Sequence, residues 1–305
     1  MRVLITGGAG FIGSHLVEHF QGKAEVRVLD NLRSGYRKNI ENFDVDFQLG
    51  DICDRAAVDK AMEGVDYVFH LAAMISVPES MSKIAECIQI NNLGMLNVLE
   101  SAAEHGVKKL CFSTSAAIYG DNPVVPKIET MFPEPKSPYA ITKLDGEYYC
   151  KMFTQEGKLQ TACLRYFNVF GPRQDPKSAY AAAVPIFTAK AVANEPMTIY
   201  GDGEQTRDFI YVKDIVAANV FMATNDFTGV YNIAYGKKIT INDLVNLIKN
   251  VTDSKSEVIH LAERAGDVKH SLAAVDKLNA TGFKPSFNFD LGMKATVEYF
   301  QSVGK

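Results

Sequence analysis

RVLITGGAGFIG, the stretch Arg2–Gly13, joins a β-branched run to glycines at positions 7, 10 and 13. A helical pattern over Ser14–Phe20 follows, and the order strand, tight turn, helix is typical of a dinucleotide-binding turn. Such glycines let the main chain approach a pyrophosphate, and the free amides at the helix start face the anion. On its own the pattern also fits a generic glycine turn.

Asp30 strengthens the dinucleotide interpretation. It ends a second β-branched stretch, Val26–Asp30, and follows Gly13 by 17 residues. This is near the ~20-residue offset of an acid that binds the ribose hydroxyls of NAD. Its charge would repel a 2′-phosphate, which favours NAD over NADP. Arg33 lies close by and would suit a 2′-phosphate, but we expect its side chain to be solvated.

Strand-like runs alternate with helix-length segments through the first half of the chain. The runs are Arg2–Thr6, Glu25–Asp30, Asp46–Leu49, Tyr67–Leu71, Lys109–Ser113 and Thr161–Arg165. Strands separated in this way form parallel sheets with helical crossovers. We therefore expect an α/β fold whose doubly wound parallel (Rossmann) sheet makes an NAD-binding domain over residues 1–165.

The second half is broken by prolines and by the turn Gly201–Gly203, with a helical pattern over Asn242–Asn250. Residues 166–305 are predicted to form a smaller α/β substrate domain. Within them, Tyr211–Thr224 reads as a helix and Val230–Ile233 as a strand, and both are expected to return to the first sheet near residues 211–234.

Composition excludes disordered, collagen-like and coiled-coil proteins. Hydrophobic residues make up 47% and charged residues 22% of the 305, with a net charge of −4 and no basic block. Small molecules are therefore expected as ligands, with no nucleic acid and no membrane. We see no signal-peptide layout and no apolar run of ~20 residues, and predict a cytoplasmic protein. The five cysteines lack a C-x-x-C pair and suggest small core residues.

One apparent metal motif lies in the helix after the glycine turn. His15-Leu16-Val17-Glu18-His19 matches the H-x-x-E-H pattern of a zinc-protease helix. That helix is expected to pack against the sheet, and no third ligand is evident in the sequence. We predict no metal site.

Tyr139 and Lys143 stand four residues apart, hence on one helical face, just after the helix start Ser137-Pro138. Tyrosine, with a pKa near 10, is a poor base at neutral pH, and we expect the lysine ammonium to lower that pKa. Such a pair also arises by chance on helix surfaces. Here the strand ending in Ser113–Ser115 brings hydroxyls to the same carboxyl edge of the sheet. Two further strand ends, at Gly50–Ile52 and His70–Ala73, fall at that edge too.

Together the glycine turn, Asp30, the serine cluster and the Tyr139/Lys143 pair resemble the extended short-chain dehydrogenases/reductases of the NAD-dependent epimerase/dehydratase family, most closely its nucleotide-sugar 4-epimerases. The resemblance implies that Ser115, Tyr139 and Lys143 are catalytic. It implies that the cofactor-binding residues are Gly7, Gly10, Phe11, Ile12, Gly13, Asp30, Asn31, Asp51, Ile52, Leu71, Ala72, Ala73, Asn91, Tyr139, Lys143 and Tyr166.

The same resemblance implies a mechanism. Tyr139 takes the proton of the sugar 4-hydroxyl, Ser115 hydrogen-bonds that oxygen, and NAD accepts a hydride from C4. The transient 4-keto sugar turns over and regains the hydride on its other face. The substrate-binding residues implied are Ser76, Ser115, Tyr139, Asn168, Val184, Thr198, Tyr200, Arg207, Arg264, Asp267 and Ser271.

Individual substrate roles follow from the resemblance. Arg207 and Arg264 fall where the family places guanidinium groups on the nucleotide diphosphate, a role that suits their planar fork. Thr198 and Tyr200 are expected beside the base, although Tyr200 would equally suit the core. Ser271 stands at the position that gates the sugar pocket, where a small residue leaves room for an acetamido group.

The resemblance also separates reactions. Related dehydratases and decarboxylases carry acidic residues where this chain has Ala116 and Ala117. We therefore expect a UDP-hexose 4-epimerase that acts on UDP-N-acetylglucosamine/UDP-N-acetylgalactosamine and on UDP-glucose/UDP-galactose. Three alternatives are kept. The first is a UDP-glucuronate 4-epimerase, with Lys83, Lys177 or Lys269 near the carboxylate. The second is another nucleotide-sugar epimerase or dehydratase, and the third is a non-catalytic NAD-bound regulator.

Quaternary structure is suggested by two amphipathic patterns. Leu93–Glu104 and Tyr139–Phe153 resemble the two helices through which such enzymes pair in a four-helix interface. The expected assembly is a homodimer.

Overall fold

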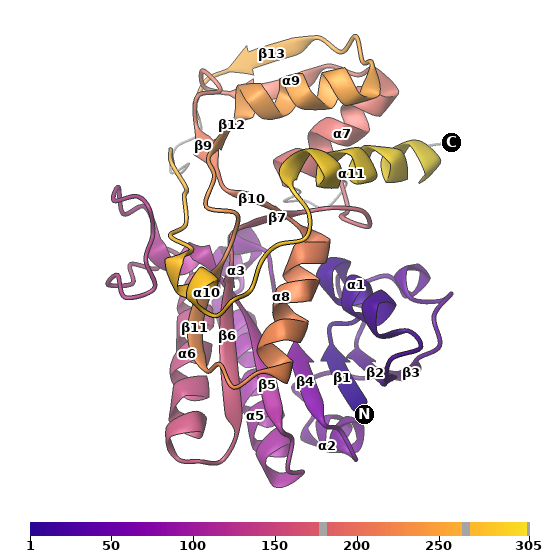
Figure 1. The fold of residues 1–305 in the computed structure, drawn as a ribbon, viewed down its shortest axis with the longest axis vertical. Coiled ribbons are helices and arrows are strands. Elements are labelled where there is room, and N and C mark those ends of the chain that lie inside the picture. The colour runs from indigo at the N-terminus through magenta and orange to yellow at the C-terminus, as the bar shows by residue number, and fades with distance from the viewer. Residues whose placement is uncertain (177–181, 264–268, 304–305) are drawn as a thin grey trace. The chain divides into compact units, whose positions relative to one another are not determined.

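Seven strands form one sheet in the computed structural model, which describes residues 1–176, 182–263 and 269–303. Their order across the sheet is β11-β6-β5-β4-β1-β2-β3, and Figure 1 shows them side by side. In chain order the strands are β1 (Arg2–Thr6), β2 (Glu25–Asp30), β3 (Asp46–Leu49), β4 (Tyr67–His70), β5 (Lys109–Ser115), β6 (Gln160–Tyr166) and β11 (Gly229–Ile233). The doubly wound sheet and the return of the late strand are confirmed.

The strand order reverses beside β1, which pairs in parallel with both β2 and β4. Thr6, the last residue of β1, lies opposite Leu29 on one side and His70 on the other. The segments that follow these three strands therefore emerge at one edge of the sheet. Ligands of open parallel sheets bind at such a reversal, outside the carboxyl ends of the strands.

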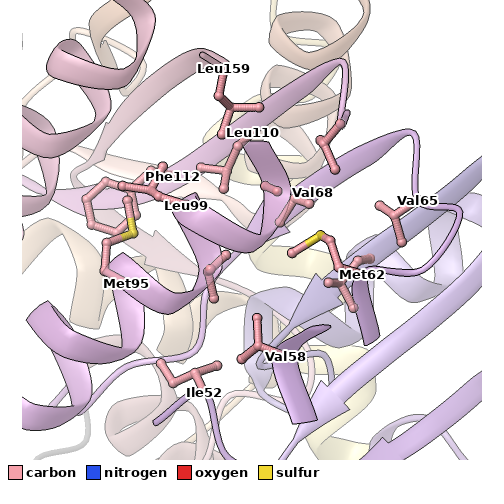
Figure 2. Packing of buried hydrophobic residues seen from close by; sticks show 14 of the residues in the cluster. Ile52, Val58, Met62, Val65, Val68, Met95, Leu99, Leu110, Phe112 and Leu159 are labelled. Atoms are coloured by element: carbon pink, nitrogen blue, oxygen red, sulfur yellow. The ribbon is translucent and has the colours of Figure 1, made fainter. Parts of the chain in front are cut away.

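Three helices cover one face of the sheet: α2 (Arg55–Met62), α5 (Gly94–Glu104) and α6 (Pro138–Gln155). Their apolar residues pack against those of the strands, as Figure 2 shows for Met62, Val68, Met95, Leu99 and Phe112. Fully burying one such side chain stabilises the fold by roughly 1.5–3 kcal/mol. This cluster anchors the helix that carries Tyr139 and Lys143.

The other face packs against α1 (Phe11–Phe20) and α8 (Val212–Thr224). The Phe20 ring of α1 lies 5.4 Å from the Phe69 ring of β4, centroid to centroid. In α8 the carbonyl of Asn219 accepts a hydrogen bond from the Cys111 thiol of β5. Four of the five cysteines are buried, as predicted, whereas Cys53 is half-buried.

Short helical segments connect β4 to α5. They are α3 (Val77–Ser82), α4 (Ile84–Ile88) and a π-helical turn, Gln89–Leu93, that runs directly into α5. Ser76 caps α3 by accepting the amide of Glu79 at 3.1 Å. Ser137 caps α6 in the same way, with Pro138 in the first turn, which fixes where that helix begins.

The chain divides into two compact units. The first comprises 1–120, 132–166 and 216–231, and the second 121–131, 167–215 and 232–305. Residues 121–131 fall in the range that was expected to belong to the sheet domain, but they cluster with the second unit. The reason is main-chain pairing: Lys127 donates to Leu272 and accepts from Ala274, each at 2.8 Å.

The second unit holds three two-stranded ladders and a helical layer. The ladders pair β7 (Asn168–Phe170) with β10 (Phe209–Tyr211), β9 (Thr206–Arg207) with β12 (Ile239–Thr240), and β8 (Met197–Tyr200) with β13 (Val258–Leu261). The helices are α7 (Ala183–Ala193), α9 (Ile241–Thr252), α10 (Asp276–Ala280) and α11 (Phe289–Val303), of which α7, α9 and α11 pack together (Figure 1). Across the described ranges, every helix is too short or too polar to span a bilayer.

Candidate active site

The glycine turn leaves no room for side chains. Gly7 has φ +72°, and a Cβ there would lie 2.7 Å from the amide nitrogen of Ala72. A Cβ on Gly13 would collide with the carbonyl oxygen of Gly7, to which the Gly10 amide donates at 3.1 Å. Phe11 and Ile12 then open α1. The turn thus has the close main-chain approach that a dinucleotide pyrophosphate requires, and these residues fit NAD.

Asp30 ends β2 with its carboxylate fixed by the main chain. Its two oxygens accept the amides of Ala9, at 2.9 Å, and Leu32, at 2.8 Å. Burial raises the pKa of Asp30, and these two hydrogen bonds partly offset the rise. An ionised carboxylate has further acceptor sites, so Asp30 can still accept ribose hydroxyls.

Asn31 and Asp51 follow neighbouring strands and meet through a 2.8 Å hydrogen bond from the Asn31 amide to the Asp51 carboxylate. Burial alone would raise the pKa of Asp51, but hydrogen bonds from the Cys53 amide and Asn31 bring it below its ordinary value. Ile52 is buried against Gly94 in α5. These residues close the β3 side of the edge.

Arg33 is exposed, as expected, and its guanidinium also forms ion pairs with two carboxylates. Its guanidinium donates to Glu79 in α3 at 2.8 Å and to Glu86 in α4 at 2.5 Å. Two carboxylates therefore neutralise the cation that would otherwise suit a 2′-phosphate. The sequence could not show this because the partners lie 46 and 53 residues away.

The segment Leu71–Met74 is held from two sides. The Thr6 hydroxyl accepts the amides of Leu71 and Ala72, at 3.2 and 3.3 Å. The side-chain amide of Asn91, in the π-helical turn, both accepts from and donates to the main chain of Met74. Asn91, which was predicted to bind the cofactor, thus orders the turn that contains Ala73.

Ser115, Tyr139 and Lys143 come together at the same edge. The Ser115 side chain, at the end of β5, interacts with Tyr139 closely enough to lower the pKa of the tyrosine. The Lys143 ammonium donates to the carbonyl of Ser113 at 2.7 Å and lies 4.8 Å from the centre of the Phe112 ring. The Tyr139 amide donates to the buried hydroxyl of Ser80, a contact with no signal in the sequence.

The predicted lowering of the Tyr139 pKa by Lys143 is wrong for this structure. Burial raises the pKa of Tyr139, and the interaction with Ser115 only partly offsets the rise. The Lys143 nitrogen lies 5.9 Å from the centre of the tyrosine ring and is itself bonded to Ser113. Burial also lowers the pKa of Lys143, to about 8. The effect of burial on the pKa of Tyr139 is therefore larger than the effect expected from the charge of Lys143.

Tyr166 lies opposite Ser115 in the register of β5 and β6. Its hydroxyl donates to the side-chain oxygen of Asn219 in α8, at 3.0 Å, and accepts from the nitrogen of the same amide. Burial raises the pKa of Tyr166. The hydroxyl is therefore a buried group that ties β6 to α8.

Glu147 and Arg165 form a buried ion pair that sequence reasoning missed. Arg165 donates to both carboxylate oxygens, at 2.8 and 2.7 Å, and the Thr114 hydroxyl donates to one of them at 2.8 Å. Glu147 could have been found, because it follows Lys143 by one helical turn on the same face. Nothing in the sequence points to its partner on β6.

In the second unit, Tyr200 lines a cavity of about 290 Å³. The remaining lining residues are Gly201, Asp202, Glu204, Gln205, Glu263, Lys269 and His270. Thr198 stands two residues before Tyr200 on β8, and both are half-buried. Tyr200 is therefore not a core residue, and its place at a cavity agrees with a role beside a ligand.

Arg207 and Ser271 are brought together by Thr206. The Thr206 carbonyl accepts the amide of Ser271, at 3.1 Å, and a guanidinium nitrogen of Arg207, at 3.0 Å. The next residue, Asp208, is fully buried and accepts amides from Tyr235, Gly236 and Ala273. This carboxylate fixes the strand that carries Arg207.

Of the other predicted substrate residues, Asn168 begins β7 and donates its amide to the carbonyl of Asp208 at 3.1 Å. Val184 is buried in α7. Arg264 and Asp267 lie outside the described residues, as does Lys177. In the first unit, Ser76 acts as the cap of α3.

His15 and His19, the two histidines of the H-x-x-E-H pattern in α1, pack against neighbouring aromatic rings. The ring of His15 is 3% exposed and lies edge-on to Phe11, 6.0 Å between centroids. Across the described ranges, no three histidine, cysteine or acidic side chains are grouped to hold a metal ion.

The chain is similar to solved nucleotide-sugar 4-epimerases over its whole length. One is the UDP-N-acetylglucosamine 4-epimerase of Methanobrevibacter ruminantium M1 in complex with UDP-N-acetylmuramic acid, with 43% identity, TM-score 0.95, and 99% of this chain and 98% of that one covered. Another is the UDP-glucose 4-epimerase of Thermotoga maritima with UDP-glucose, with 40% identity, TM-score 0.95 and both chains covered completely.

A third solved relative carries the cofactor. The UDP-glucose 4-epimerase of Thermus thermophilus, in complex with NAD, shows 38% identity and a TM-score of 0.91 over 99% of each chain. A curated relative with a different reaction, UDP-glucuronic acid decarboxylase 1 of Xenopus tropicalis, is 31% identical over 98% of this chain and 72% of its own length.

The family description "NAD dependent epimerase/dehydratase family" matches residues 3–234. That match covers more than half of the chain, and the solved relatives extend it to both ends. The chain therefore belongs to the NAD-dependent epimerase/dehydratase family, whose members are extended short-chain dehydrogenases/reductases, and its cofactor is NAD.

Proposed function

We propose that this chain is a UDP-hexose 4-epimerase with tightly held NAD, whose residues 1–165, with the returning segment, bind the cofactor. The observation that carries the proposal is the meeting of Ser115, Tyr139 and Lys143 at the sheet edge that also holds the glycine turn. Bound NAD supplies the acceptor and donor of hydride at sugar C4. The chain's own residues bind and orient the sugar and move its 4-hydroxyl proton.

Tyr139 is the base and Ser115 the hydrogen-bonding partner of the same sugar oxygen. Burial disfavours the phenolate, and the interaction with Ser115 favours it. Positive charge bound beside Tyr139 would further favour the phenolate. Lys143 remains largely an ammonium at neutral pH, since its pKa of about 8 lies above 7, and it is free to donate to a ribose as well as to Ser113.

Epimerisation is favoured over elimination and decarboxylation by the residues after Ser115. Ala116 and Ala117 begin the 3₁₀ turn Ala116–Tyr119, and neither can donate or accept a proton. Dehydration of C5–C6 needs an acid and a base at this place. The relatives of this chain include a UDP-glucuronic acid decarboxylase, but Ala116 and Ala117 offer no side chain that could transfer a proton in either reaction.

The second unit supplies the groups for the nucleotide sugar. Arg207 offers a planar fork for the diphosphate, and Tyr200 with Thr198 offers a surface for the base. Ser271 leaves room for an acetamido group, so both UDP-N-acetylglucosamine and UDP-glucose are substrates in this proposal. The names of the solved relatives include both sugars.

A uronic acid substrate would need a cation near the sugar carboxylate. Of the three lysines considered for this role, Lys83 pairs with Glu79 at 3.0 Å and Lys269 pairs with Glu263 at 3.3 Å, whereas Lys177 lies outside the described residues. Both described lysines are thus already paired with carboxylates, which disfavours this substrate. Intact Ser115, Tyr139 and Lys143 likewise argue against a regulator without activity.

A homodimer is part of the proposal. Exposed apolar side chains gather on the neighbouring elements α4, the π-helical turn and α6: Ile84, Ile88, Leu93, Ile141, Tyr148 and Met152. A second copy of this chain presenting the same helices would bury them in a symmetric interface.

We also assign the protein to the cytoplasm. Its five cysteines are free, although Cys150 and Cys163 are close enough to interact, and thiols stay reduced in that compartment.

The experiment is a substrate panel. The purified protein, without added cofactor, is incubated with UDP-glucose, UDP-N-acetylglucosamine and UDP-glucuronate, and the products are separated and quantified. We expect the 4-epimers of the first two sugars, with NAD recovered from the denatured protein. Turnover of UDP-glucuronate alone, or release of carbon dioxide from it, would contradict the proposal.

A further inference from the structure

A buried ion pair of Glu147 and Arg165 joins the helix and a strand next to the catalytic residues. The side chains of Glu147 and Arg165 are 4% and 5% exposed. Arg165 binds the carboxylate with two nearly parallel hydrogen bonds, at 2.8 and 2.7 Å, a geometry that fixes direction as well as distance. The Thr114 hydroxyl occupies a further acceptor site of the same carboxylate.

The pair connects every element that carries a catalytic side chain. Glu147 lies on α6, two turns after Tyr139 and one after Lys143. Thr114 precedes Ser115 on β5, and Arg165 precedes Tyr166, the register partner of Ser115 on β6. The Arg165 guanidinium also lies 4.8 Å from the centre of the Tyr119 ring, in the 3₁₀ turn that Ser115 caps.

Stability alone does not explain such a pair. Removing two charges from water is costly, and well-packed apolar residues of similar volume are often as stable or more so. The surrounding contacts between strands and helix are already apolar. What an ion pair adds is a fixed geometry, because the planar guanidinium of an arginine forms two hydrogen bonds with a carboxylate in one relative orientation only.

We propose that Glu147 and Arg165 are positioning residues that set the distance between Tyr139 on α6 and Ser115 on β5. The inference rests on the proposed catalytic roles of these two residues. A shift of the helix along the strand would change the distance between the Tyr139 and Ser115 side chains, and Ser115 is the group that lowers the pKa of the tyrosine. A misplacement of about 1 Å at a reacting group can cost on the order of 10²-fold in rate.

The test replaces the pair by apolar residues and asks whether stability and rate separate. In the triple variant Thr114→Val/Glu147→Leu/Arg165→Met, the hydroxyl is removed with its acceptor. We expect a melting temperature equal to or above that of the wild type. We expect kcat to fall roughly 10²-fold with KM and NAD content unchanged, and the pH of half-maximal kcat to rise, because Tyr139 loses the interaction with Ser115 that favours its phenolate.

A matched control uses the opposite end of the same strand. Lys109 is a buried cation at the start of β5, and its ammonium donates to the carbonyl of Asn225. Lys109→Met also removes a buried charge from that strand but leaves the catalytic end intact. It should change the melting temperature while leaving kcat and its pH profile as in the wild type.

Two further single variants test the proposal in case the triple variant does not fold. Arg165→Lys keeps the charge and loses the fork, and Thr114→Val loses one hydrogen bond. Each should lower kcat, by roughly 10-fold for the lysine, and move the pH profile in the same direction. Wild-type kcat and pH profile in the folded triple variant, or in both of these variants, would overturn the proposal. If Tyr139→Phe also turns over normally, the catalytic assignment has failed instead.

Discussion

The two units hold their functional residues by different means. In the first, the glycine turn and Leu71 follow strands of one parallel sheet, and Asp30 and Ser115 end strands of the same sheet, whose register fixes their positions. In the second, Tyr200 and Arg207 lie on two-stranded ladders of two to four residues. The sheet edge is a rigid platform suited to chemistry, whereas short ladders allow the binding surface to vary. We therefore expect changes in the first unit to affect kcat or the cofactor, and changes in the second to affect KM and sugar choice.

Tyr139→Phe should give the largest effect, because it removes the only proposed base at the sheet edge. We expect kcat to fall on the order of 10³-fold or more, with the nucleotide content of the purified protein unchanged. Initial rates and NAD released on denaturation measure the two quantities. In the wild type, kcat should also fall toward low pH, as the tyrosine gains its proton. A variant with near-normal turnover would show that the platform carries different chemistry.

Gly7→Ala should release the cofactor. A Cβ at this position meets the Ala72 amide at 2.7 Å and must adopt φ +72°. We expect NAD affinity to fall on the order of 10²-fold or more, and stability to fall by about 1–3 kcal/mol. The control is Gly22→Ala, since Gly22 has φ +69° with open space around it. Equal loss of NAD in both variants would mean that backbone strain, rather than the close approach, is responsible.

Arg207→Gln should weaken binding of the nucleotide sugar without loss of NAD. The lost charge-assisted hydrogen bonds correspond to a rise in KM of roughly 10- to 100-fold, with a much smaller change in kcat. Steady-state kinetics with UDP-glucose and the nucleotide content of the protein test this. If kcat falls and KM does not, the proposed division of labour between the units is incorrect.

Ser271→Tyr should narrow the choice of sugar. A bulky side chain takes the space of the acetamido group, so kcat/KM for UDP-N-acetylglucosamine should fall about 10- to 100-fold while that for UDP-glucose changes little. Ser271→Ala, which stays small, is the matched control and should retain both substrates. Parallel losses for the two sugars in the tyrosine variant would remove Ser271 from the role of gate.

The smallest effect is expected at Arg33. Glu79→Gln with Glu86→Gln removes the two carboxylates that pair with the Arg33 guanidinium. We expect NADP to bind a few-fold more tightly, because the cation can then interact with a 2′-phosphate, while NAD binding stays the same. The effect is small because interactions between exposed charges are weak. Cofactor titrations of the stripped protein measure this. Lys83→Gln leaves both Arg33 pairs in place and serves as the control. Unchanged NADP binding would assign the discrimination to Asp30 alone.

What could be predicted from the sequence follows the same division. The strand ends and the Tyr139/Lys143 pair were predictable because period and spacing report on sheets and helix faces directly. The direction of the Tyr139 pKa was not, since burial comes from elements far away in the chain. Arg33 with its two carboxylates and Glu147 with Arg165 were missed for a related reason: each partner is specified only by the folded chain.

The π-helical turn at Gln89–Leu93 has a consequence for insertions and deletions. A π-helical turn is closed by hydrogen bonds from residue i to i+5, so it holds one residue more than an α-helical turn. Removing one residue from it would restore an α-helical turn, and α5 could keep its buried Met95 and Val98 toward the sheet. The expected loss on such a deletion is the contact of Asn91 with Met74, and with it the order of the segment Leu71–Met74.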